Sequence, residues 1–91
     1  MGYGKVTVGS GSAALIVSAN TLRLSLIIVN IGSSFIYIGD DPSVSSATGL
    51  GIDAYQSYAE ASGGQRMFLG DIYGIAEDHT NDVRYWERNR A

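Results

Sequence analysis

Short apolar runs, separated by clusters of glycine and serine, make up most of this chain. β-Branched and aromatic residues within such runs are typical of β-strands, and the Gly, Ser, Asn and Asp between them are typical of turns. The runs that predict strands are Lys5 to Val8, Ala14 to Ser18, Arg23 to Asn30, Phe35 to Ile38, a less regular Ile52 to Tyr58, Arg66 to Leu69, Ile72 to Ala76 and Asp82 to Trp86. Seven or eight short antiparallel strands predict an all-β fold, a small β-sandwich or jelly roll.

The stretch from Leu22 to Asp40 holds two apolar runs joined by Asn-Ile-Gly-Ser-Ser, and we interpret it as the central hairpin of the domain. Gly9 to Ser12 is interpreted as a flexible hairpin connection. A short helix over Asp53 to Ala61 is the competing interpretation of that segment, because Ala, Gln and Glu favour helices.

The run from Leu22 to Ile31 is apolar on both faces of a strand. Alternation places Leu22, Leu24, Leu26 and Ile28 on one face, and Ile27, Val29 and Ile31 with Arg23 and Ser25 on the other. A second apolar face needs a cover, which is either a segment of the same chain or a partner subunit. Ile27, Val29 and Ile31 are therefore the candidate subunit interface.

Ninety-one residues with 45% hydrophobic side chains indicate a single domain over residues 1–91, with 1–4 and 87–91 as extended termini. The chain has no cysteine, so disulfides cannot stabilise so small a core. Oligomerisation is the remaining source of buried area, and we expect a homo-oligomer, with a trimer preferred.

The net charge of −3 argues against a nucleic-acid partner, because phosphate contacts need clustered Lys and Arg. The longest N-terminal apolar run, Ala13 to Val17, is far shorter than the roughly 20 residues that span a bilayer. We therefore expect neither a nucleic-acid partner nor a membrane segment.

Three features could carry chemistry, and each has a plainer interpretation. Asp40-Asp41-Pro42-Ser43 offers oxygens to Ca²⁺ but lacks the spacing of a calcium loop, and a type I turn explains it. His79 lies in a polar loop, and no Gly-x-Ser-x-Gly elbow accompanies it, so a hydrolase is a remote alternative. We expect no catalytic residue, no cofactor and no metal.

The C-terminal segment Tyr85-Trp86-Glu87-Arg88-Asn89-Arg90 combines aromatic and guanidinium groups, which are enriched at protein interfaces. A last strand with a solvated basic tail and stacking on nucleic-acid bases are the alternatives. The candidate partner-binding residues are Tyr3, Tyr85, Trp86, Arg88 and Arg90.

Several strand and turn residues carry a resemblance that spans about residues 4 to 87. They are Arg23-Leu24-Ser25-Leu26, Ile28, Asn30, Gly32, Ile36-Tyr37-Ile38-Gly39, Gly70-Asp71-Ile72-Tyr73, Ile75-Ala76, Asp82-Val83-Arg84 and Glu87. The pattern resembles the small β-sandwich virion proteins of tailed bacteriophages. This resemblance implies a non-enzymatic structural role, most often as a head decoration (cement) or head-fibre protein, or as a minor tail or baseplate component.

We accordingly expect a capsid decoration protein that is made in the host cytoplasm and binds the outer surface of a phage head. Its partner would be the major capsid protein or another virion protein, and many modest contacts on one lattice would stabilise the shell. The alternatives are a tail, baseplate or fibre component, and a glycan- or receptor-binding module that uses Tyr55, Tyr58 and the acidic turns.

Overall fold

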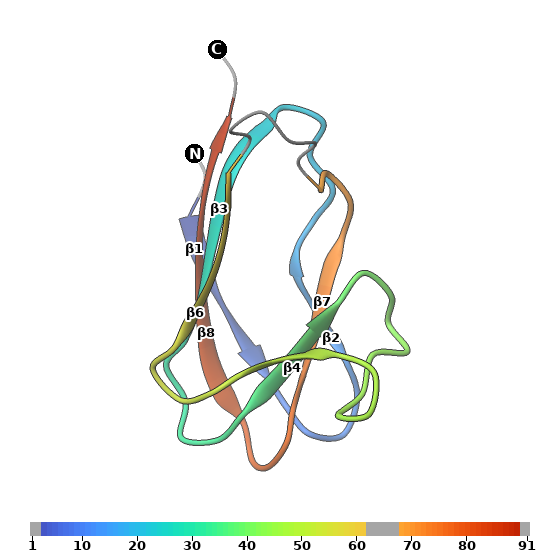
Figure 1. The fold of residues 1–91 in the computed structure, drawn as a ribbon. Helices are drawn as coiled ribbons and strands as arrows, with labels where there is room; N and C mark the ends of the chain where they lie inside the picture. The colour runs from blue at the N-terminus through green and yellow to red at the C-terminus, as the bar shows by residue number, and fades with distance from the viewer. Residues whose placement is uncertain (1–2, 62–67, 90–91) are drawn as a thin grey trace.

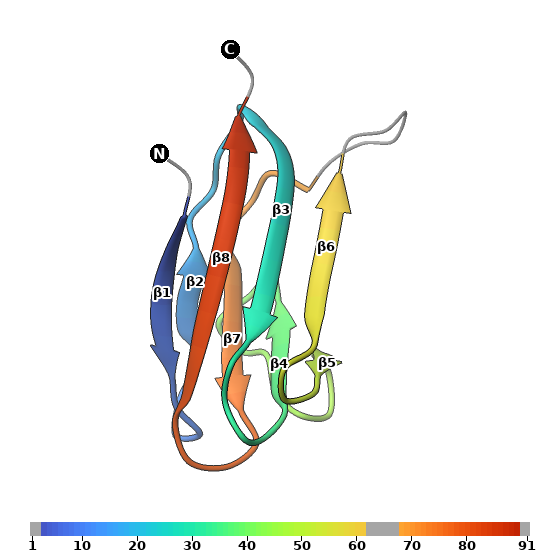
Figure 2. The same ribbon diagram turned by 90° about the vertical axis from the view of Figure 1, so that its left-hand side faces the viewer.

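The computed structural model describes residues 3–61 and 68–89, and they form eight strands in two antiparallel sheets (Figure 1). The strands are β1 (Tyr3–Val8), β2 (Ala14–Val17), β3 (Arg23–Asn30), β4 (Ile36–Gly39), β5 (Leu50–Ile52), β6 (Ser57–Ala61), β7 (Ile72–Ala76) and β8 (Asn81–Asn89). Sheet A has the order β1-β8-β3-β6, which Figure 2 shows face on, and sheet B has the order β2-β7-β4-β5. The expected all-β sandwich is confirmed.

The strand order is that of a jelly roll. The first strand pairs with the last, and the chain changes sheet at every connection except the one between β4 and β5. Two four-stranded sheets wound in this way are the double Greek key of jelly-roll domains.

The predicted hairpin over Leu22 to Asp40 is wrong, because β3 and β4 belong to different sheets. The Asn30 side chain explains the crossing: its Oδ1 accepts a hydrogen bond from the Gly32 N–H, and its Nδ2 donates to the carbonyls of Ser34 and Ile52. These bonds turn the chain toward sheet B. The segment Gly9 to Ser12 likewise joins two sheets and is not a hairpin connection.

The segment from Ile52 to Ala61 is neither one strand nor a helix. A turn separates β5 from β6, with Gln56 N–H donating to Asp53 O at 3.1 Å and Tyr55 at a φ of 60°. The left-handed backbone at Tyr55 is incompatible with a right-handed helix. Of the strand predicted over Arg66 to Leu69, Phe68 and Leu69 lie in an irregular loop, and the remainder falls outside the described residues.

The residues expected as extended termini belong in part to sheet A. Tyr3 and Gly4 pair with Trp86 and Tyr85, and β8 continues through Glu87 to Asn89 beside β3. Both ends of the described chain are therefore held in the ladder of the same sheet.

The core lies between the two sheets and is built from alternate residues of the strands. Its buried aliphatic side chains are Val8, Ile16, Val17, Leu26, Ile28, Ile36, Ile38, Val44, Ile52, Ile72, Ala76 and Val83. Arg23, which was expected on the outward face with Ile27, is also fully buried. The register between β3 and β8 shifts between Arg23 and Ser25, and this irregularity reverses the alternation so that Arg23 points inward.

Candidate docking face

The outward side chains of sheet A lie in rows across its four strands. Tyr3, Trp86, Ile27 and Ala59 are aligned in the register and form one row. The next row consists of Lys5, Arg84, Val29 and Ser57. On the opposite side of the first row, Arg88 lies beside Ser25. We call this surface, defined by these residues, the docking face.

The docking face exposes large apolar groups although it occupies the centre of a sheet. Tyr3 is 66% exposed, Trp86 56% and Ile27 38%, while Val29 is half-buried. Trp86 and Ile27 are neighbours on the two central strands, β8 and β3. Exposed aromatic and aliphatic groups that are contiguous on one face mark an interaction surface.

A shallow hollow lies beside Trp86 on this face. It is lined by Ser25, Leu26, Ile27, Ala59, Glu60, Trp86 and Arg88. Ser25 and Ala59 have small side chains on either side of Ile27, whereas Trp86 and Arg88 are large, and this difference in size creates the depression. Such a hollow beside Trp and Arg is the kind of place where a partner side chain is anchored.

The charges of the docking face are predominantly positive. Arg84 contacts Asp82, with 3.1 Å between Arg84 Nη2 and Asp82 Oδ2, on the surface of β8. Lys5 and Arg88 form no ion pair with any residue that the structure describes. The face therefore presents cations around an apolar centre.

The structure brings most of the predicted residues together. The docking face includes three of the predicted partner-binding residues, Tyr3, Trp86 and Arg88. It also includes two residues of the predicted subunit interface, Ile27 and Val29. Ile31 follows β3 and is half-buried, with its N–H donating to Asp82 O. Ser25 was expected on this face of β3, whereas Lys5 and Ala59 were missed, because only the pairing of β1 and β6 with the central strands shows that they belong to the same surface.

Two predicted partner-binding residues lie elsewhere. Tyr85 is on the inward side of β8, where its ring packs against the core and occupies the space that a side chain at Gly4 would need. The alternation of β8 sends Tyr85 inward and Trp86 outward. Arg90 lies outside the described residues.

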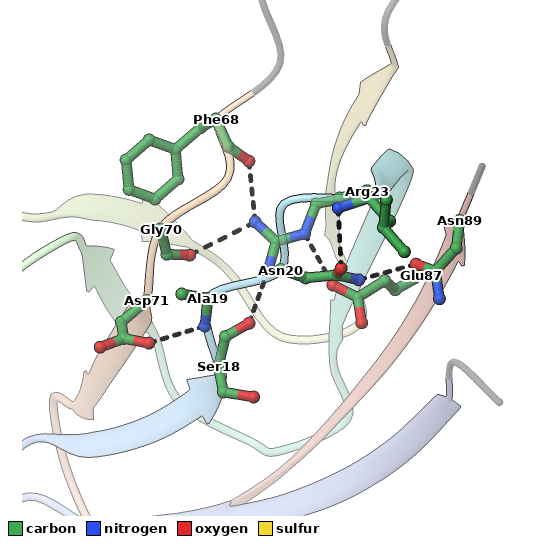
Figure 3. Close-up of polar contacts among 10 residues, drawn as sticks. Ser18, Ala19, Asn20, Arg23, Phe68, Gly70, Asp71, Glu87 and Asn89 are labelled. Carbon is green, nitrogen blue, oxygen red and sulfur yellow. Dashed lines mark hydrogen bonds and ion pairs between the residues drawn. The ribbon is translucent and has the colours of Figure 1, made fainter.

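A buried polar network closes one end of the sandwich (Figure 3). Arg23 Nε donates to Glu87 Oε2 at 2.6 Å, and its other nitrogens donate to the carbonyls of Phe68, Gly70 and Ser18. Arg23 thus ties β8 to the loops before β3 and β7. Each of these hydrogen bonds from Arg23 goes to another residue of the same domain, so the network stabilises the fold.

The surroundings of Asp41 and of Tyr58 shift the pKa of each side chain. Hydrogen bonds from the backbone N–H and hydroxyl of Ser43 lower the pKa of Asp41, as expected for a capped turn. Burial, and then the charge of Glu60, raise the pKa of Tyr58. Tyr58 packs against the core, whereas Tyr55 is 73% exposed on a turn, so the two rings face different surroundings.

The described residues form no metal site and no membrane-spanning helix. No group of three His, Asp or Glu side chains that could hold a metal ion is found among residues 3–61 and 68–89. His79 is exposed in the loop between β7 and β8, with Nε2 at 3.4 Å from Asp78 Oδ2. In the part of the chain that the structure describes, no helix is long and apolar enough to cross a membrane.

Comparisons of the chain with protein-family models, with curated proteins and with solved structures found no match.

Proposed function

We propose that the protein is a non-enzymatic structural subunit of a virus particle, and specifically a decoration protein that binds the outer surface of a phage head and stabilises it. The docking face carries this proposal, because Trp86 and Ile27 on the two central strands and Tyr3 on the neighbouring edge strand expose apolar area that a monomer gains nothing from. The resemblance to small β-sandwich virion proteins favours a partner that is itself a virion protein, such as the major capsid protein.

The mechanism is passive attachment. Trp and Arg are the residues most often found at the energetic centre of protein interfaces, and Trp86 and Arg88 flank the same hollow. The apolar row supplies affinity, and the cations around it select a partner surface that carries carboxylates. Each contact is modest, but many copies on one lattice act together against the pressure inside the head.

The test is binding to heads of the encoding virus that lack this protein. We expect the wild-type chain to saturate the heads at a fixed number of copies and to raise the temperature at which they rupture. The double variant Trp86→Ala, Arg88→Ala should leave most positions empty. Leu22→Ala is the matched control, since Leu22 is 53% exposed but lies in the loop before β3.

Two outcomes contradict the proposal. Full occupancy by the double variant would show that the docking face does not bind the head. Absence of binding by the folded wild-type chain, both to heads and to complete particles, would remove the virion function itself. If the chain bound only to tails, baseplates or fibres, the docking face would attach the protein to that part of the particle and not to the head.

A glycan- or receptor-binding module is the second candidate. The observation that favours it is a pocket at the open edge of the sandwich, lined by Ile38, Gly39, Asp40, Leu50, Tyr58, Phe68 and Ile72. Aromatic rings pack on sugar faces, and a carboxylate accepts hydrogen bonds from sugar hydroxyls. Binding on a glycan array that is lost in Asp40→Ala and kept in Trp86→Ala would favour this candidate over the docking face.

A further inference from the structure

The charged residues are divided unequally between the two sheets. Every Lys and Arg that the structure describes lies on a strand of sheet A: Lys5, Arg23, Arg84 and Arg88. The strands of sheet A also carry Glu60, Asp82 and Glu87, whereas the strands of sheet B carry no charged residue. Five exposed carboxylates lie instead in the loops that follow the strands of sheet B, namely Asp40 and Asp41 after β4, Asp53 after β5, and Glu77 and Asp78 after β7. All the described cations therefore lie on sheet A, and the loops that follow the strands of sheet B are acidic.

The outward side of sheet B is also apolar. Leu15 and Tyr73 are aligned in the register, and Ile75 and Tyr37 form the next pair. Leu15 is 44% exposed, and the rings of Tyr37 and Phe35 stack with centroids 6.0 Å apart. We call this surface, together with the five carboxylates in the loops at the ends of its strands, the acidic face.

The docking face and the acidic face match each other in size and in charge. The molecule measures 38 × 21 × 19 Å, so each broad side has an area on the order of 800 Å², about the area that a stable interface takes from each partner. Two docking faces in contact would bring Lys5 and Arg88 of both copies together, and like charges in contact are unfavourable. When a docking face contacts an acidic face, cations lie beside carboxylates and the two apolar centres are in contact.

We propose that the docking face of one copy binds the acidic face of the next copy, so that the chain assembles head to tail. This inference rests on the proposed function in one respect, since both treat the docking face as an assembly surface. The two faces lie on opposite sides of the sandwich, so a pair of copies still has one free face of each kind. Addition therefore continues past the dimer into an open chain, whose first copy keeps its docking face free to bind the head.

Light scattering coupled to size exclusion, run over a concentration series, tests the arrangement. The wild-type mass should rise past that of a dimer. The variants Lys5→Glu, Arg88→Glu on one face and Asp40→Lys, Glu77→Lys on the other should each weaken association by about tenfold or more. In an equimolar mixture the two normal faces match each other and the two charge-reversed faces also carry opposite charges, so the variants should form alternating assemblies and restore the wild-type mass.

Controls separate this effect from folding and from net charge. All four substituted side chains are exposed, so thermal unfolding of each variant should match that of the wild type. The control variant Ser10→Glu, Thr21→Glu adds negative charge in loops outside both faces and should associate normally.

Several results would overturn the proposal: a monomer at all concentrations, growth that stops at a dimer, tighter association of the Lys5→Glu, Arg88→Glu variant, or no recovery on mixing. The proposed function is judged separately, because self-association needs no capsid. A chain that binds heads while remaining monomeric would contradict this inference alone, and one that assembles but never binds particles would contradict the proposed function alone.

Discussion

Arg23 is the largest side chain that is fully buried in the described part of the chain. A guanidinium can be buried at such a place only when its charge is paired and each of its nitrogens has a hydrogen-bond acceptor. Glu87 supplies the charge, and the carbonyls of Ser18, Phe68 and Gly70 supply the acceptors. The residue therefore fixes the loops at one end of the sandwich and does not serve the docking face.

Replacing Arg23 should be among the most destabilising single changes. Arg23→Ala leaves the largely buried Glu87 carboxylate and three carbonyls without their donor, and should lower the free energy of unfolding by about 3–5 kcal/mol. Urea unfolding followed by circular dichroism measures this. Arg84→Ala is the control, because its ion pair with Asp82 is exposed and should contribute less than about 1 kcal/mol. Equal midpoints for the two variants would contradict this account of Arg23.

Gly32 is required by the close approach of a buried amide. A Cβ at position 32 would lie 2.2 Å from Asn81 Cγ, and Asn81 Nδ2 donates to Ser34 O at 2.8 Å. Gly32→Ala should therefore lower the free energy of unfolding by about 1–3 kcal/mol, because Asn81 must move away from its acceptor. In Gly11→Ala the new methyl group meets no atom within 4 Å, so that variant should unfold near the wild-type midpoint. Similar losses in both variants would show that the contact with Asn81 is unimportant.

At the scale of the elements, β8 has two separate roles. It is the central strand between β1 and β3, and its alternation sends Tyr85 and Glu87 into the sandwich and Trp86 and Arg88 onto the docking face. Residues 87–91 were expected to form an extended terminus. The pairing of Glu87 with Leu26, of Arg88 with Ser25 and of Asn89 with Arg23 places the first three of these residues in the sheet.

Shortening β8 should therefore unfold the protein rather than remove a tail. A chain that ends at Trp86 loses the carboxylate that faces Arg23 and the last ladder pairs with β3. We expect it to lack cooperative thermal unfolding, whereas a chain that ends at Asn89 keeps these contacts and should unfold cooperatively. Matching unfolding curves for the two chains would contradict this role of β8.

At the scale of the whole molecule, the topology makes nearly every contact non-local. The first strand pairs with the last, and only β4 and β5 form a hairpin. The ladder of sheet A cannot be completed until both ends of the described chain have met. The same winding gives one small domain two apolar outward faces, one with cations around its centre and one with acidic loops at the ends of its strands, which is the basis of the proposed assembly.

Folding should accordingly be slow for a chain of this length. Domains dominated by non-local pairing fold in about milliseconds to seconds, because loop-closure entropy is lost before the contacts form. Stopped-flow circular dichroism after dilution from urea measures the rate. The Lys5→Glu, Arg88→Glu variant should refold at a similar rate, since these side chains are exposed. Folding within microseconds would contradict this dependence on topology.

The sequence by itself determined most of the strands and the class of fold. Alternating apolar residues located β3, β4 and β7 closely, and the glycine-rich turns between them indicated a sandwich. Alternation in β3 also singled out Ile27 and Val29 as outward apolar residues, because side-chain direction in a strand is a local property.

Only the tertiary structure decided which strands are neighbours. The sequence shows the same short turns whether the chain stays in one sheet or crosses to the other, so the connections at Asn30 to Ser34 and at Gly9 to Ser12 were misassigned as hairpins. Long-range pairing placed Tyr3, Trp86 and Ile27 in one row, and the register shift beside Arg23 directed the Arg23 side chain into the core. These outcomes depend on contacts between distant segments, and a local pattern of residues carries no information about them.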